Sequence, residues 1–283
     1  MQLAVVIPTL GRRPAELERA VRACAGCEVV VARDAAAAPV DVPARVVQAA
    51  RPGASAARNA GWRATEADVV LFVDDDVVLD PGAAAAHRAA HLREPAEHVA
   101  TLGPVRWADG ARTTPFMRWL DRGIQFDFGS IEGDDAGWGR FVTANGAMKR
   151  SLLERLGGFD EERLPFGYED LDLAKRAEGL VVRYVRDAGA QHLHAPTLEE
   201  WTRRVERIAR AEAAFCAKHP DAEPWFAVRF APFEHHPRPS GRAVRLAALV
   251  GERGPLRAAV DNTYRALLAP AFMRAWRAAR SPR

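Results

Sequence analysis

The stretch 69-VVLFVDDDVVLDPG-82 decides the fold of this chain, because a strand ends there at three consecutive carboxylates. Five apolar residues, Val69 to Val73, precede Asp74, Asp75 and Asp76. A continuous apolar run of this length is typical of a strand in a parallel sheet that is covered on both faces. Ligands bind outside the carboxyl ends of such strands, so the position of the carboxylates predicts a binding site.

The three carboxylates also indicate what the site binds. Adjacent carboxylates repel and raise one another's pKa unless a cation compensates them. Asp74 and Asp76 are two residues apart and point the same way in extended backbone. A divalent cation that shares its other positions with substrate phosphates would compensate them, which predicts a metal–diphosphate site. The alternative is a solvated turn or helix-capping acids, although Asp80 and Pro81 already offer a cap to the next helix.

Strand and helix patterns alternate on both sides of this stretch. Strands are expected at 3–7, 28–32, 44–49, 69–73 and 180–185, with another after Phe141. Helices are expected from Pro14, over 53–65, in a short segment ending at Gly157-Gly158, and over 169–179 and 199–219. This order predicts an α/β fold with a mostly parallel sheet and helices on its faces.

Length and composition fit one large α/β domain with an appendage. The chain has 283 residues, of which 48% are hydrophobic and 27% charged, which is ordinary for a globular protein. No apolar run approaches the ~20 residues of a membrane span. The first ten residues, MQLAVVIPTL, have no basic region before their apolar part, so we interpret them as a strand and not a signal peptide. A cytoplasmic location is the default expectation.

Cys24 and Cys27 form a C-x-x-C pair, which raises the question of a redox or zinc site. The sequence has no second pair for zinc. The pair also ends a helix, whereas a thioredoxin-type pair opens one. We therefore interpret both cysteines as small apolar residues at a helix exit.

The C-terminal part of the chain is basic. Residues 236–283 hold ten Arg against Glu252 and Asp261, a net charge of +8, which leaves −5 for residues 1–235. The segment 235-HHPRPSG-241 has the Pro and Gly spacing of a linker. Such an asymmetry suggests an anionic partner, but no nucleic-acid motif accompanies it.

Apolar residues in this tail recur at helical spacing, at Leu256, Val260, Tyr264, Leu267 and Leu268. One hypothesis is that residues 242–283 form a basic amphipathic helix that lies on the inner face of the membrane and meets a lipid-linked acceptor. The alternative is that the tail packs on the catalytic domain or on a partner subunit.

Five motifs in order resemble the family 2 glycosyltransferases of GT-A fold. They are VVIPTLGR (5–12), GASAARNAGWRAT (53–65), the DDD of 74–76, TANGAMKRSLLERLGGFDE (143–161) and FGYEDLDLAKRAEG (166–179). The resemblance covers roughly residues 3–215. It implies an enzyme that transfers a sugar from a nucleotide sugar, UDP being the expected nucleotide, with a divalent metal, Mn²⁺ or Mg²⁺, and with inversion at the anomeric carbon.

The resemblance also implies roles for individual residues. Asp170, or alternatively Glu169, would be the catalytic base, and Asp76 with His192 would bind the metal, with His194 as the alternative histidine. Trp138 and Asn145 are the expected acceptor contacts, Trp138 because its ring, like those of Trp119, Phe126 and Phe128, could stack on a sugar. The donor-binding residues would be Pro8, Thr9, Asp34, Arg58, Asp74 and Asp75.

The chemistry of sugar transfer supports a second acid far from Asp76. A base must deprotonate the acceptor hydroxyl on the face opposite the leaving group, and a metal-bound carboxylate is poorly suited to that task. The pair Glu169-Asp170 supplies such an acid, although the same pair could instead cap the helix that it opens. Many family members have D-D-x-S where this chain has Arg33-Asp34-Ala35-Ala36, so recognition of the nucleotide base departs from the family pattern.

The resemblance divides the chain into functional regions. Residues 1–220 would form the catalytic domain, with a nucleotide-sugar half at 1–103 and an acceptor half at 104–220, followed by a linker at 221–241. The aromatic-rich segment 116–141 would form a lid or an acceptor wall, or else fill a local core. Two other functions stay open: a sugar-phosphate nucleotidyltransferase, and a non-catalytic carbohydrate- or partner-binding relic of the fold.

Overall fold

The structure of the protein is a computed structural model, and it describes residues 1–250 and 256–281. The chain divides into two compact units. The first comprises Met1–Gly110 and Phe128–His194, and the second comprises Ala111–Asp127 and Ala195–Arg283. Positions 251–255 and 282–283 of the expected basic tail lie outside the described residues.

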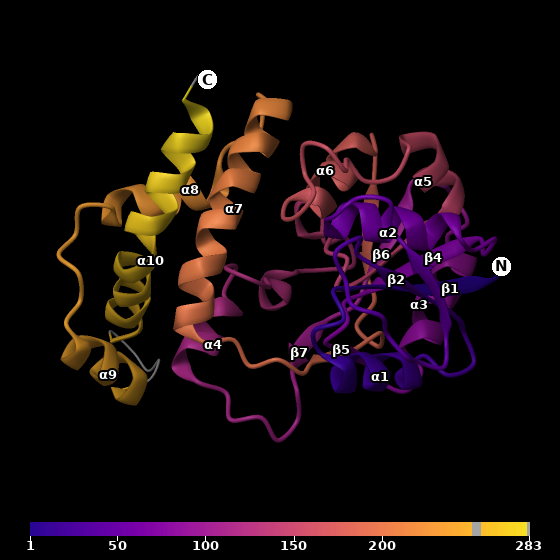
Figure 1. The fold of residues 1–283 in the computed structure, drawn as a ribbon, viewed down its shortest axis with the longest axis horizontal. Helices are drawn as coiled ribbons and strands as arrows, with labels where there is room; N and C mark the ends of the chain where they lie inside the picture. Colours follow the sequence, from indigo (N-terminus) through magenta and orange to yellow (C-terminus); the bar gives the residue numbers. More distant parts are fainter. Residues whose placement is uncertain (251–255, 282–283) are drawn as a thin grey trace. The chain divides into compact units, whose positions relative to one another are not determined.

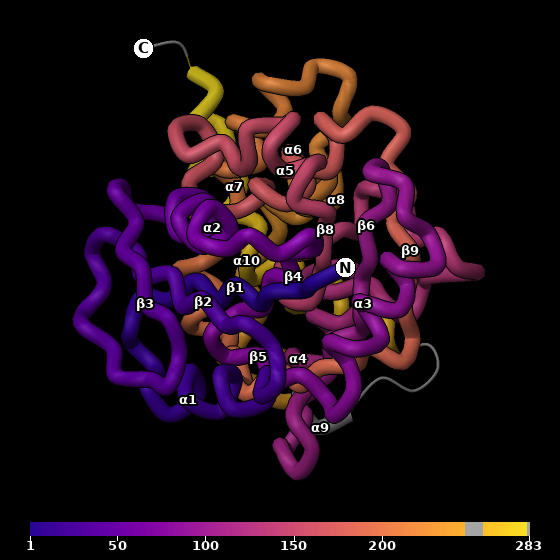
Figure 2. The backbone as a smooth tube through the Cα atoms, turned by 90° about the vertical axis from the view of Figure 1, so that its right-hand side faces the viewer, coloured from indigo at the N-terminus to yellow at the C-terminus, as the bar shows by residue number. Residues whose placement is uncertain are grey.

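The first unit is built on a seven-stranded sheet with the order β3-β2-β1-β4-β8-β6-β9 (Figure 2). Strands β1 to β4 run parallel to one another, and β8 runs antiparallel to β4 and β6. The mostly parallel α/β sheet expected from the sequence is confirmed. The strands are β1 (Leu3–Thr9), β2 (Glu28–Arg33), β3 (Arg45–Gln48), β4 (Val69–Val73), β6 (Val99–Leu102), β8 (Asn145–Lys149) and β9 (Val181–Tyr184).

Helices cover both faces of this sheet, with α2, α5 and α6 on one face and α1 and α3 on the other (Figures 1 and 2). Helix α2 lies so close to β1 that a Cβ at Gly61 would come within 2.3 Å of Val6 Cγ1. Gly157 ends α5 in the left-handed conformation, as the Gly-Gly signal predicts. The helices are α1 (Pro14–Ala23), α2 (Ala54–Arg63), α3 (Ala83–Arg93), α5 (Arg150–Leu156) and α6 (Glu169–Arg176).

A second sheet of three short strands lies beside the DDD turn. Its order is β5 (Val77–Leu79), β10 (Ala190–His192) and β7 (Val105–Trp107). In this sheet His192 pairs with Val77, and the backbone N–H of Leu193 donates to Asp76 O at 2.8 Å. This sheet, which the sequence patterns did not predict, brings a histidine next to the carboxylates.

The expectation that Asp80 caps the next helix is wrong. Helix α3 begins after Gly82, which has φ 86°, and no side chain caps its N-terminus. Asp80 instead accepts from Arg106 Nη1 at 2.6 Å and Nη2 at 3.1 Å. The partner comes from β7, 26 residues away, so the local sequence could not reveal it.

The second unit is helical. Helix α10 packs against α7 and α8 and runs alongside α7 (Figure 1). The unit contains α4 (Pro115–Leu120), α7 (Leu198–Lys218), α8 (Trp225–Phe230), the 3-10 helix η3 (Ala231–Phe233), α9 (Gly241–Val250) and α10 (Leu256–Arg280). The segment 221–241, expected as a linker, therefore contains α8 and η3. The expected bounds of the catalytic domain (1–220) and of its two halves stay predictions.

The apolar side of α10 is packed inside this unit. Val260, Tyr264, Leu268 and Phe272 are each at most 3% exposed. Phe272 contacts the rings of Phe226 and Phe230 of α8. For these four residues, the structure shows the tail packed on the protein itself, the alternative to a membrane-bound helix. No helix in the described part of the chain is long and apolar enough to span a membrane.

Candidate active site

The DDD turn between β4 and β5 holds Asp75 against the end of β1. The Thr9 hydroxyl donates to Asp75 Oδ2 at 2.6 Å. Burial raises the pKa of Asp75 to about 6; the Thr9 hydrogen bond opposes this rise and the Asp76 carboxylate reinforces it. The mutual repulsion inferred from the sequence is therefore present at the middle carboxylate of the three.

Asp76 is 7% exposed and lies between a cation and a histidine. Arg13 Nη1 is 2.6 Å from Asp76 Oδ2, and His192 Nε2 is 3.7 Å from Oδ1. His192 Nδ1 is 2.9 Å from the carbonyl oxygen of His194. A carbonyl only accepts, so Nδ1 carries the proton in the neutral ring and Nε2 presents its lone pair toward Asp76.

These contacts test whether the site fits a metal ion. Among residues 1–250 and 256–281, no group of three or more His, Cys, Asp or Glu side chains is arranged to hold one. Asp76 and His192 nevertheless form a pair of ligand types, and the His194 carbonyl orients the imidazole as in protein metal sites. Magnesium-type sites often use one or two protein ligands and take the rest from phosphates and water. The residues present fit a metal that binds together with a diphosphate.

Arg58 bridges two of the sequence motifs. It is 5% exposed, and its Nη2 and Nη1 contact Asp74 Oδ1 at 2.9 Å and Glu169 Oε1 at 2.7 Å. Burial by itself would lower the pKa of Arg58, but the carboxylates of Asp170, Asp74 and Glu169 outweigh it and raise the pKa. The expectation put Arg58 near the nucleotide base, whereas its contacts here are with carboxylates.

Glu169 and Asp170 have different environments. Glu169 is 5% exposed and fixed by Arg58, while its Oε2 has no hydrogen-bond partner among the described residues. Asp170 is half-buried and accepts from the Thr143 N–H at 3.1 Å and the Thr143 hydroxyl at 2.8 Å. Burial raises the pKa of Asp170 to about 7, with a further rise from Glu169 and opposition from Arg58 and Thr143. A carboxyl that titrates near neutral pH suits a general base.

The capping alternative for this pair does not describe the structure. Helix α6 has no side-chain cap, and its N-cap residue is Tyr168 at φ 63°, a conformation that bulky residues rarely adopt. The third acid of the segment, Asp172, is fully buried and accepts from Arg176 Nε at 2.9 Å. Asp170 thus combines a raised pKa with partial exposure.

Asp34 lies at the carboxyl end of β2, where the donor base was expected. Its Oδ1 accepts from Ala36 N at 2.7 Å and its Oδ2 from Gly53 N at 2.6 Å. The carboxylate therefore ties the loop after β2 to the start of α2. Pro8, at the carboxyl end of β1, is half-buried. A base contact by Asp34 would add to these two bonds.

The two expected acceptor residues occupy different places. Trp138, in the 3-10 helix η2 (Trp138–Arg140), is 39% exposed, and the Lys175 ammonium lies 5.0 Å from its ring centroid. Asn145 has no exposed surface, which argues against direct contact with an acceptor. Of the other aromatic residues of segment 116–141, Trp119 and Phe126 are buried, and Phe128, in η1 (Phe128–Ser130), stacks on Tyr184.

Asn145 instead ends a buried hydrogen-bond chain behind the sheet. Its amide donates to Ala188 O at 2.7 Å, so its oxygen accepts from His87 Nε2 at 3.0 Å. His87 Nδ1 then accepts from the Thr101 hydroxyl at 2.7 Å. The chain continues through His91 Nε2, 3.2 Å from the Thr101 hydroxyl, to Lys149, whose Nζ is 3.1 Å from His91 Nδ1. Because the single hydrogen of the Thr101 hydroxyl goes to His87 Nδ1, the hydroxyl oxygen accepts from His91 Nε2, and the tautomers of both histidines follow.

The cysteines show no sign of a reactive pair. Cys24 and Cys27 are free, and burial raises the pKa of Cys24 to about 12, which leaves it protonated at neutral pH. The Cys24 thiol is 3.2 Å from Ala20 O within α1. Both features agree with the interpretation as small apolar residues.

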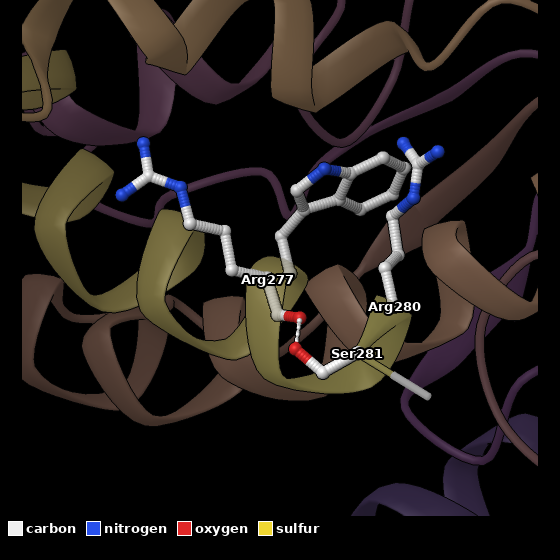
Figure 3. Close-up of a pocket in the computed structure, with 4 residues that line it drawn as sticks. Arg277, Arg280 and Ser281 are labelled. Carbon is white, nitrogen blue, oxygen red and sulfur yellow. Dashed lines mark hydrogen bonds between the residues drawn. The ribbon is translucent and has the colours of Figure 1, made fainter. Parts of the chain in front are cut away.

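A separate hollow of about 470 Å³ lies on the last turn of α10, lined by Trp276, Arg277, Arg280 and Ser281 (Figure 3). Arg277 pairs with Glu234, and the Arg280 guanidinium lies 5.1 Å from the centroid of the Trp276 ring. None of the site residues discussed above lines this hollow, and its arginines already have partners within the second unit.

Arg13 and Thr143 are the two residues of the site that the sequence analysis did not assign. Arg13 directly follows the first motif, and Thr143 begins the fourth. Arg13 contacts Asp76, 63 residues away, and Thr143 contacts Asp170, 27 residues away. Sequence periodicity carries no signal for pairs of that separation.

Relatives of the chain were found in sequence. The model described as Glycosyltransferase like family 2 matches residues 3–211. Pre-mycofactocin glycosyltransferases of Mycobacterium tuberculosis are 28% identical over 235 residues. The match covers 77% of this chain and 48% of each relative, so the chain spans about half the length of these curated relatives.

Solved structures share the fold. Crystal structures of S. aureus TarS 1-349 alone and in complex with UDP have TM-scores of 0.54 and 0.50, at 16% and 15% identity. They cover 98% and 97% of this chain and 91% of TarS 1-349. GalNAc-T7 with UDP, GalNAc and Mn²⁺ has a TM-score of 0.51 at 13% identity, covering 76% of this chain and 51% of that chain. Because the family model spans most of its length, the chain belongs to the glycosyltransferase-like family 2, and its fold is GT-A.

Proposed function

We propose that the chain is a metal-dependent, inverting glycosyltransferase that moves a sugar from a UDP-linked donor to an acceptor hydroxyl. The observation that carries the proposal is the division of acids in the first unit. Asp76 lies beside His192, whereas Asp170 is held by Thr143 and titrates near neutral pH. Sugar transfer needs both kinds of acid, one for the diphosphate end of the donor and one for the acceptor.

Asp170 takes the role of the base. Its carboxylate accepts the proton of the acceptor hydroxyl as the oxygen attacks the anomeric carbon, and the bond to the diphosphate breaks on the opposite side. One displacement of this kind inverts the anomeric centre. The raised pKa of about 7 gives Asp170 the basicity that a carboxylate at a helix N-terminus would otherwise lack.

Asp76 and His192 would hold the metal, Mn²⁺ or Mg²⁺. When bound, such an ion neutralises the negative charge that develops on the leaving diphosphate. The GalNAc-T7 structure was solved with UDP and Mn²⁺, and one TarS structure was solved with UDP, which supports testing these two ligands first.

The donor would lie along the carboxyl ends of β1, β2 and β4, at Pro8, Thr9, Asp34, Asp74 and Asp75. Arg58 would contribute indirectly, because its ion pairs fix the positions of the Asp74 and Glu169 carboxylates. Glu169, fixed in that ion pair, is a poorer candidate for the base than Asp170.

The acceptor would approach past Trp138, whose exposed ring can stack on a sugar or another flat group. The name of the Mycobacterium relatives makes pre-mycofactocin one acceptor to test. A lipid-linked acceptor is the other. Contact of 242–283 with the inner membrane face could not use the buried apolar side of α10. It would use exposed residues of the described part of this segment, such as Leu246 of α9 and Arg274 and Arg277 of α10. Liposome flotation with and without 242–283 tests that contact, and equal binding of both forms would contradict it.

The proposal is tested by thermal stabilisation with a panel of nucleotide sugars, with Mn²⁺ and with EDTA. A ligand that binds the native state raises the melting temperature. We expect one donor to stabilise the protein only with Mn²⁺ and to lose this effect in Asp76→Asn. No stabilisation by any nucleotide sugar would instead favour the non-catalytic relic, and stabilisation by a nucleoside triphosphate with a sugar phosphate would favour the nucleotidyltransferase.

A further inference from the structure

Arg13 places a cation on the carboxylate that is the proposed metal ligand. It lies between β1 and α1, and its Nη1 is 2.6 Å from Asp76 Oδ2. The adjacent Arg12 is exposed, so the two neighbouring arginines differ in position although they share charge and size.

The Arg13 guanidinium neutralises the charge of Asp76, but another cation could replace it. Asp76 is buried, and a buried carboxylate without a cation is strongly disfavoured. The Arg13 side chain, in contrast, is 37% exposed. Water can solvate the half-exposed guanidinium once it leaves, so exchanging it for another cation leaves neither charge uncompensated. Loss of the ion pair is therefore more costly for the buried carboxylate of Asp76 than for the half-exposed guanidinium of Arg13.

A divalent cation and the guanidinium would compete for Asp76. A hard cation that binds the same carboxylate would lie close to the guanidinium that now contacts Oδ2. The two positive groups would repel each other. Oδ1 faces His192 Nε2 at 3.7 Å, so an ion held by Asp76 and His192 would share the carboxylate with the guanidinium and would be repelled by it.

We propose that Arg13 is a displaceable counter-ion of the metal ligand: it neutralises Asp76 in the ligand-free protein, yields Asp76 to the divalent cation, and then contacts the diphosphate of the donor. This inference rests on the proposed function. A diphosphate offers the planar guanidinium a bidentate partner, so the released side chain gains new hydrogen bonds. Arg13 is at the N-cap of α1, close to the carboxyl end of β1, which is the edge assigned to the donor.

The test titrates MnCl₂ alone into wild type, Arg13→Gln, Arg13→Lys and the matched control Arg12→Gln, by calorimetry or by electron paramagnetic resonance of free Mn²⁺. Removal of the competing charge is expected to tighten Mn²⁺ binding in Arg13→Gln by about tenfold or more. Arg13→Lys keeps a cation there, and Arg12→Gln removes an exposed, solvent-screened one, so both should stay within about threefold of wild type. Unchanged or weaker Mn²⁺ binding in Arg13→Gln, or no Mn²⁺ binding in any variant, would overturn the proposal.

A second titration uses UDP in the presence of saturating MnCl₂, the condition in which Arg13 is expected to have left Asp76. Since Arg13 contacts the diphosphate once released, Arg13→Gln should bind UDP about tenfold more weakly than Arg12→Gln. Equal UDP affinity in the two variants would overturn the diphosphate contact. If UDP binds no variant, the UDP donor site itself fails, and the Mn²⁺ titration alone still decides the competition for Asp76. Melting temperatures measured without ligand show whether each variant is folded.

Discussion

Both oxygens of the Asp170 carboxylate are held by a single residue, Thr143, whose N–H donates to Oδ2 and whose hydroxyl donates to Oδ1. Thr143 has no exposed surface and lies just before β8, so the sheet fixes its position. The orientation and basicity of the proposed base are therefore set by a threonine 27 residues away.

Thr143→Val removes the hydroxyl bond but keeps the side-chain shape. That bond favours the charged form of Asp170, so its loss should raise the pKa of Asp170 from about 7 by about one unit. Deprotonated Asp170 is the active form, so kcat/KM should rise with pH through this pKa, and the acid limb should move to higher pH. The pH profile of kcat/KM checks this, and Thr143→Ser should restore the wild-type limb. An acid limb that does not move in Thr143→Val would contradict it.

Arg58→Met should strongly destabilise the first unit. It leaves Glu169 buried without its cation, a change that typically costs about 3–5 kcal/mol. Adding Glu169→Gln to Arg58→Met should restore part of the loss, because the buried charge is then gone. Urea denaturation of the two single variants and the double variant measures this coupling. Additive losses in the double variant would show that the pair is not coupled.

Gly61→Ala tests the close contact between α2 and β1. The added Cβ would approach Val6 Cγ1 to 2.3 Å and Ala32 Cβ to 3.2 Å. Overpacking of this kind usually destabilises a core by about 1–3 kcal/mol. Gly139→Ala is the matched control, because a Cβ there meets nothing within 4 Å and φ is not positive. Equal free energies of unfolding for the two variants would refute the packing argument.

The buried histidines predict a loss of stability in mild acid. Burial lowers the pKa of His87 to about 4 and that of His91 to about 3, from 6.5 in the unfolded chain. The unfolded state then binds more protons below pH 6.5, so stability falls between pH 6.5 and about 4, by about 3 kcal/mol for His87 alone. His87→Gln should lower stability at pH 7, through altered hydrogen bonds to Thr101 and Asn145, and should flatten this pH dependence. The free energy of unfolding as a function of pH decides it, and an unchanged slope in His87→Gln would assign the acid sensitivity to other groups.

Local patterns in the sequence were sufficient to predict much of the fold. The apolar run Val69–Val73 became a fully buried central strand, and the glycine at 157 ended a helix as expected. Parallel order followed from the alternation of strands and helices, because right-handed crossovers leave few other arrangements. These features depend on neighbours in the sequence.

The contacts within the candidate site join residues far apart in the sequence, so local patterns do not reveal them. The pairing of Asp76 with His192 was expected from the family resemblance alone. The short strand β10 pairs with β5 across more than 100 residues, which places His192 beside Asp76. Its three residues are too few to show a strand period. Asn145 was expected at the acceptor because it lies in a motif, and only the three-dimensional packing shows that it is buried behind the sheet.

The most direct test of the account is Asp170→Asn, assayed for donor binding and for sugar transfer. With the donor identified by the stabilisation panel, wild type and Asp170→Asn should bind it equally in the presence of Mn²⁺. Release of the nucleoside diphosphate in the presence of acceptor should fall by about 10²–10⁴-fold in Asp170→Asn, because the base is gone. Transfer at near wild-type rate by Asp170→Asn would contradict the assignment of Asp170 as the base.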